Sequence, residues 1–97
     1  MHQLPEFRLP VTYRPEVARE LLRHGVSARA DVQPRVAYRF LRALMTFEIR
    51  DRKARRRELE RFLGPQPLAD YARQIEELRA NYSLLRVPLG DWISPLP

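Results

Sequence analysis

The feature that most constrains this chain is a stretch of thirty residues, 34–63, with no glycine and, after Pro34, no proline. Its apolar residues recur every three or four positions, which is the spacing of a helix with one buried face. Pro34 suits the first turn, and the sequence Gly64-Pro65-Gln66-Pro67 is a stop signal. We predict one long helix over 34–63. A break near Arg50 is the alternative, although no residue there requires one.

Two shorter helices are predicted on either side of this stretch. Pro15 begins a helix over 15–24, and Gly25 ends it, because glycine readily adopts the left-handed conformation found after helix C-termini. A third helix is predicted over 67–86. Its apolar residues follow the 3–4 spacing of a seam between packed helices. These residues are Leu68, Tyr71, Ile75, Leu78, Tyr82 and Leu85.

The length of 97 residues fits a single domain. We predict an all-α fold with a three-helix arrangement, in which the long central helix and the C-terminal helix form an antiparallel hairpin. This helical domain covers 15–86. The proline-rich ends, 1–14 and 87–97, are predicted to be extended arms with at most a short pairing between them. The arms either fold back on their own chain or exchange with a second copy.

The net charge of the chain is concentrated in the long helix. Lys+Arg number 18 and Asp+Glu number 12, which gives a formal net charge of +6. Residues 34–63 alone hold ten basic and four acidic residues, whereas 1–33 contribute +1 and 64–97 contribute −1. All but one of the basic residues are arginine. This excess reflects either phosphate recognition or a GC-rich genome.

The cations of the long helix gather on one side at about 100° per residue. The opposite side is apolar and predicted to be buried, and comprises Ala37, Phe40, Leu41, Leu44, Phe47, Leu59 and Phe62. A phosphate backbone attracts such a row of cations, whereas an ordinary solvated surface mixes both signs of charge. The alternatives are a solvated face or pairing with another protein. The candidate nucleic-acid-binding residues are Arg35, Arg39, Arg42, Arg50, Lys53, Arg57 and Arg61.

The centre of the apolar side is interrupted by Glu48, Asp51, Arg52 and Arg55. Three interpretations stay open: arginine stems cover the third helix, two ion pairs form a partly buried layer, or the seam faces another subunit. The last interpretation predicts a homodimer. Its interface would comprise Leu68, Tyr71, Ile75, Leu78, Tyr82, Leu85 and Trp92.

Residues for catalysis are sparse. The chain has no cysteine, and its three glycines are too far apart for a phosphate-binding loop. His2 lies in the N-terminal arm, His24 lies in the last turn of a predicted helix, and the chain has no Glu-x-x-His pair. No serine lies in a nucleophile motif. We therefore expect no enzymatic activity, no cofactor, no metal and no small-molecule substrate.

The functional prediction follows from these features. No apolar run approaches the ~20 residues of a membrane span, and the first residues lack the pattern of a secretory signal. We therefore expect a cytoplasmic protein. The leading hypothesis is association with RNA, DNA or a ribonucleoprotein through the arginine-rich helix face. The alternative is a protein–protein interaction or adaptor subunit, or an obligate oligomer without a nucleic-acid role. Because the phenylalanines of the helix are predicted to be buried, we expect no base stacking.

Overall fold

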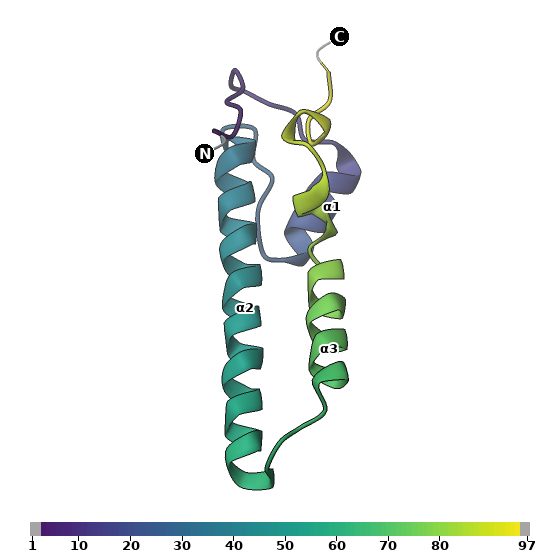
Figure 1. Cartoon of the computed structure of the whole chain (residues 1–97). Helices are drawn as coiled ribbons and strands as arrows, with labels where there is room; N and C mark the ends of the chain where they lie inside the picture. The colour runs from purple at the N-terminus through teal and green to yellow at the C-terminus, as the bar shows by residue number, and fades with distance from the viewer. Residues whose placement is uncertain (1–2, 96–97) are drawn as a thin grey trace. The chain divides into compact units, whose positions relative to one another are not determined.

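A computed structural model describes residues 3–95, and these residues contain three α-helices and no sheet strand. The helices are α1 (Pro15–Arg23), α2 (Pro34–Leu63) and α3 (Leu68–Ala80), followed by the short 3-10 turns η1 (Ser83–Arg86) and η2 (Leu89–Asp91) (Figure 1). The prediction of an all-α fold is therefore confirmed. The outermost parts of the two predicted arms, 1–2 and 96–97, lie outside the described residues.

The bounds of α2 agree with the prediction, and α1 ends one residue earlier than predicted. The predicted helix over 67–86 was too long, because α3 ends at Ala80 and the chain then turns into η1. Tyr82 and Leu84 are both buried, at 3% and 6% exposed. Two residues that are two positions apart in an α-helix point about 200° apart, so a continuous helix could not bury both against one side.

The chain forms two compact units, and α2 contributes to both of them. The first unit comprises the described residues up to Arg42 and those from Leu84 onward, and the second comprises 43–83. In the first unit the described parts of the two predicted arms, 3–14 and 87–95, fold back on their own chain. Tyr13 forms an antiparallel bridge with Ile93, and the Ser94 N–H donates to the Thr12 carbonyl at 2.7 Å.

Trp92 is the centre of the first unit. Its side chain is fully buried, and its indole N–H donates to the Val87 carbonyl at 3.1 Å. The Tyr38 ring, on the part of α2 that belongs to this unit, lies 6.1 Å from the indole ring. Leu21 from α1 and Leu41 from α2 are also fully buried. The C-terminal segment thus supplies the largest side chain of the core.

The second unit contains the rest of α2, the connection 64–67 and α3, which lie side by side in Figure 1. Gly64 ends α2 with a positive φ of 81°, a conformation that favours glycine. The buried core of this unit is small. Leu78 and Tyr82 are 5% and 3% exposed, and the half-buried residues of the same unit include Ile49 and Ile75.

The predicted buried side of α2 is wrong over most of its length. Ala37 and Leu41 are buried, but the larger members of the set are exposed by half or more: Phe40 54%, Phe47 71%, Leu59 50% and Phe62 77%. The inward side lies roughly a quarter-turn away, because Tyr38 contacts Trp92 in the first unit and Arg56 contacts Tyr71 in the second.

Candidate nucleic-acid interface

The seven predicted phosphate-binding cations all lie on α2, in two different environments. Arg35, Arg39 and Arg42 belong to the first unit. The Arg35 guanidinium lies 3.3 Å from a carboxylate oxygen of Glu6, and Arg42 also has a partner within the chain. Arg39 is exposed. This part of the row is therefore partly occupied by contacts within the protein.

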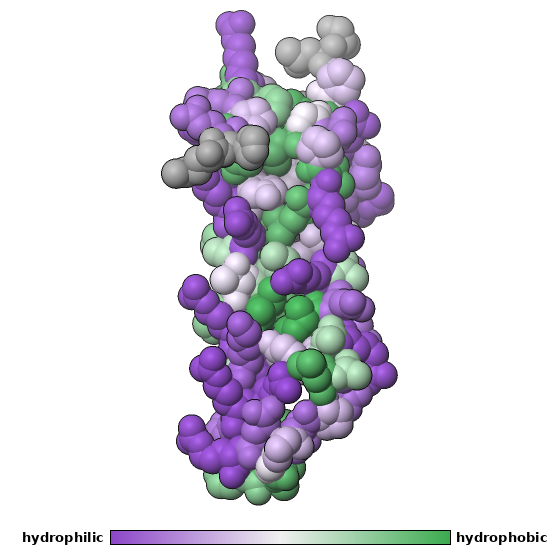
Figure 2. All heavy atoms as spheres, viewed as in Figure 1, coloured by the Kyte–Doolittle hydropathy of each residue, from purple (hydrophilic) through white to green (hydrophobic). Residues whose placement is uncertain are grey.

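The other four cations belong to the second unit and form a surface that we call the cationic face, which consists of Arg50, Lys53, Arg57 and Arg61. All four side chains are exposed. Within residues 3–95, none of the four lies within 4.0 Å of a carboxylate oxygen. Figure 2 shows hydrophilic residues along this side of α2. At 1.5 Å per residue the cationic face is about 16 Å long, about the length of five phosphates on one strand.

Other arginines of the same helix segment are neutralised by acids one turn away. Arg55 Nε lies 3.1 Å from Asp51 Oδ2, and Arg56 Nε lies 3.0 Å from Glu60 Oε1. The Asp51–Arg55 pair is largely exposed, so it does not form a buried ionic layer. Within residues 3–95, the acids of this segment that form ion pairs therefore pair with Arg55 and Arg56 and not with members of the cationic face.

Glu48, which interrupts the predicted apolar side, hydrogen-bonds to Tyr82. Burial, followed by the hydrogen bond and the charge of Glu48, raises the pKa of Tyr82 from 10.0 to about 12. Glu48 on α2 therefore contacts Tyr82, which follows the end of α3, within the second unit.

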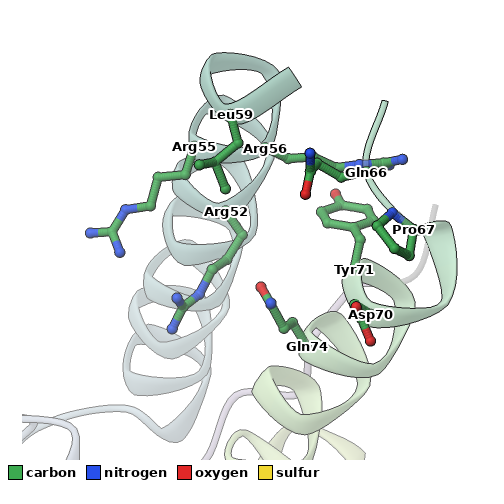
Figure 3. Close-up of a pocket in the computed structure, with 9 residues that line it drawn as sticks. All are labelled: Arg52, Arg55, Arg56, Leu59, Gln66, Pro67, Asp70, Tyr71 and Gln74. Atoms are coloured by element: carbon green, nitrogen blue, oxygen red, sulfur yellow. The ribbon is translucent and has the colours of Figure 1, made fainter. Parts of the chain in front are cut away.

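A pocket of about 320 Å³ lies between α2 and α3 beside the ring of Tyr71, and sequence reasoning did not find it (Figure 3). The Arg56 guanidinium carbon lies 4.7 Å from the centre of that ring, which is the geometry of a cation–π contact. The lining residues are Arg52, Arg55, Arg56, Leu59, Gln66, Pro67, Asp70, Tyr71 and Gln74. The sequence predicts that Tyr71 lies in a seam between helices, and no spacing in the sequence indicates that an arginine lies over its ring.

The seven residues predicted for a dimer interface are mostly covered by their own chain. Leu78, Tyr82 and Trp92 are buried, and Tyr71, Ile75 and Leu85 are half-buried. Only Leu68 in this set is exposed, at 65%. It belongs to a group at the connection between α2 and α3 that we call the apolar end: Leu59, Phe62, Leu63 and Leu68.

The described part of the chain was compared with two further kinds of feature, a metal-ion site and a membrane-spanning helix. Residues 3–95 contain no group of three or more His, Asp or Glu side chains that could hold a metal ion. No α-helix between those limits has the length and apolar character needed to cross a membrane. Comparison of the chain with protein-family models, curated proteins and solved structures gives no match.

Proposed function

We propose that the protein binds the phosphate backbone of nucleic acids through the cationic face. The observation that carries this proposal is the set of four exposed cations on one side of α2, none of them paired with a carboxylate within residues 3–95. Cations that repel one another at three- and four-residue spacing cost a helix a few tenths of a kcal/mol per pair. A polyanion along this face removes that repulsion and releases its own counterions.

The proposed binding is independent of base sequence along the backbone. Guanidinium and ammonium groups that contact phosphates fix the position of a nucleic acid without reading its bases. Arg50, Arg57 and Arg61 each carry a planar donor group that matches phosphate oxygens in pairs. Their exposure means that these contacts need no rearrangement of the fold.

The test is a charge-reversed variant, Arg50→Glu, Lys53→Glu and Arg57→Glu. Its matched control reverses three exposed arginines of the first unit, Arg8, Arg19 and Arg86, to Glu. Both variants lower the formal net charge from +6 to zero. Fluorescence anisotropy with a labelled oligonucleotide at about 50 mM salt measures the binding, and circular dichroism checks the folding of each variant.

We expect the variant of the cationic face to lose binding while it keeps the fold, because these side chains are exposed and unpaired. The control should bind at least tenfold more tightly than that variant. Equal losses in both would show that net charge alone drives binding, which contradicts a localised site. Unfolding of the variant would show that the cationic face has a structural role.

The apolar end favours a second candidate function, which is interaction with a protein, including a second copy of this chain. Its four members are exposed from 50% to 77%, and Figure 2 shows an apolar cluster at the end of the second unit. Light scattering at micromolar concentration measures the mass of the particle in solution. A mass near 11.6 kDa would exclude self-association. A doubled mass that returns to 11.6 kDa in a Phe62→Ser, Leu63→Ser variant would support it.

A further inference from the structure

The apolar end is the largest group of exposed apolar side chains in the second unit. Within residues 43–83, five large apolar side chains are exposed, and four of them form the apolar end. Three of these members belong to the last two turns of α2 and the fourth is the first residue of α3, so they gather where the connection 64–67 joins the two helices (Figure 1). Contact of large apolar side chains with water is unfavourable, so a group of this kind marks a surface that another surface covers.

Positive charge borders the apolar end. Arg57 and Arg61 lie on the last two turns of α2, both side chains are exposed, and within residues 3–95 neither lies within 4.0 Å of a carboxylate oxygen. The stretch 50–63 holds seven basic and three acidic residues. Two of these acids pair with arginines at 3.1 and 3.0 Å, whereas Glu58 has no ion pair in the described part of the chain. This end of the second unit therefore combines apolar side chains with an excess of cations.

The spacing of these groups along α2 matches the layers of a membrane surface. At 1.5 Å per residue, Arg61 and Arg57 lie about 3 and 9 Å back from Leu63 along the helix. Apolar surfaces that bind at a membrane interface enter it by about 5–10 Å, to the boundary between headgroups and acyl chains. When α2 meets the membrane end-on and the apolar end reaches that depth, both guanidinium groups lie among the headgroups. Anionic lipids attract cations at this level.

We propose that the apolar end enters the headgroup region of a membrane that contains anionic lipids, with Arg57 and Arg61 against the headgroups. A second copy of the chain fits this surface less well. The partners of a two-fold dimer use the same patch, so Arg57 and Arg61 of both copies would meet, and like charges that face each other across an interface are costly. Anionic headgroups carry the opposite charge. The inference is carried by the apolar end, which the proposed nucleic-acid contacts do not use.

The experiment measures co-sedimentation of the protein with two kinds of vesicle at about 100 mM salt. One kind is phosphatidylcholine alone, and the other contains about 30% phosphatidylserine. The variant Phe62→Ser, Leu63→Ser removes two apolar side chains and leaves the charge unchanged. Its matched control, Phe40→Ser, Leu22→Ser, removes an exposed phenylalanine and an exposed leucine of the first unit. Circular dichroism checks the folding of both variants.

We expect the wild-type protein to bind the vesicles with phosphatidylserine about 30-fold more tightly than phosphatidylcholine alone, which is the effect of two cations at an anionic surface. Phe62→Ser, Leu63→Ser should weaken binding to the anionic vesicles at least tenfold, because two apolar side chains no longer leave water. The control should stay within about twofold of the wild-type protein. Oligonucleotide affinity should be the same for all three proteins, so a failure of the membrane inference is distinguishable from a failure of the proposed function.

Three results would overturn the inference. The first is no binding to the anionic vesicles, or equal binding to both kinds of vesicle. The second is equal binding by the wild-type protein and Phe62→Ser, Leu63→Ser, which would mean that net charge alone adsorbs the protein. The third is a doubled particle mass without vesicles that this variant abolishes, which would mean that a second copy covers the apolar end.

A Phe62→Trp variant keeps the inference testable if the serine variant does not fold. Tryptophan favours the membrane interface, and its emission moves to shorter wavelength when the side chain leaves water. Because Trp92 is fully buried, a shift on addition of anionic vesicles reports the environment of position 62. We expect such a shift, and unchanged emission would contradict insertion of the apolar end.

Discussion

Replacing Trp92 with alanine tests whether the C-terminal segment closes the core of the first unit. The indole is fully buried and donates one hydrogen bond, to the Val87 carbonyl. Burying a tryptophan removes about 150–250 Å² from water, which is about 4–6 kcal/mol at about 25 cal/mol per Å². Measured losses for such truncations are about 3–5 kcal/mol. We expect the free energy of unfolding of the first unit to fall by about 4 kcal/mol.

Urea denaturation followed by far-UV circular dichroism measures this loss. Trp92→Phe is the matched variant, because it keeps an aromatic ring and removes the indole N–H. It should cost about 1–2 kcal/mol, since the Val87 carbonyl loses its donor and a small void forms. A loss below about 1 kcal/mol for Trp92→Ala would refute the reasoning, because it would mean that the segment is not packed into its own chain in solution.

Two further predictions concern stability. Burial raises the pKa of Tyr13 from 10.0 to about 12, and burial with Glu48 does the same for Tyr82. As the pH rises, the two tyrosine hydroxyls therefore lose their protons in the unfolded chain before they do so in the folded chain. This contribution to the free energy of unfolding is fully present below about pH 10 and falls by about 2–3 kcal/mol per tyrosine toward pH 12. Urea midpoints measured at about pH 9 and about pH 11 would reveal the decline. Gly64→Ala should lower the free energy of unfolding by about 1 kcal/mol, because Gly64 has a positive φ. Gly90→Ala should leave it nearly unchanged in the same denaturation assay, because the added Cβ meets nothing within 4 Å.

Helix positions could be predicted from the sequence because the signals are local. The run from Pro34 to Leu63 has no interruption, and the residues that follow it cannot continue a helix, so the bounds of α2 were predicted correctly. The early end of α3 was missed because it depends on packing. The chain turns after Ala80 so that Tyr82 and Leu84 can both be buried, and the periodic spacing of apolar residues carries no sign of this turn.

Which side of α2 faces inward could not be predicted from its apolar residues alone, because long charged side chains also pack against neighbouring residues. The hydrophobic pattern predicts that Phe47 and Phe62 are buried, but both are exposed, and the Arg56 guanidinium lies over the Tyr71 ring on a different side of α2. The row of cations was visible in the sequence. The contacts that neutralise Arg35 and the pocket beside Tyr71 involve residues far apart in the chain, so spacing along one helix gave no indication of them.

The salt dependence of binding tests the central claim, that the cationic face binds phosphates, most directly. Anisotropy titrations of the wild-type protein with oligothymidylate between about 50 and 200 mM salt give the slope of the logarithm of affinity against the logarithm of salt concentration. Each phosphate neutralised on a single strand contributes about −0.7, so the four cations Arg50, Lys53, Arg57 and Arg61 predict a slope of about −3. A slope shallower than about −1, or no binding at the lowest salt concentration, would contradict the account.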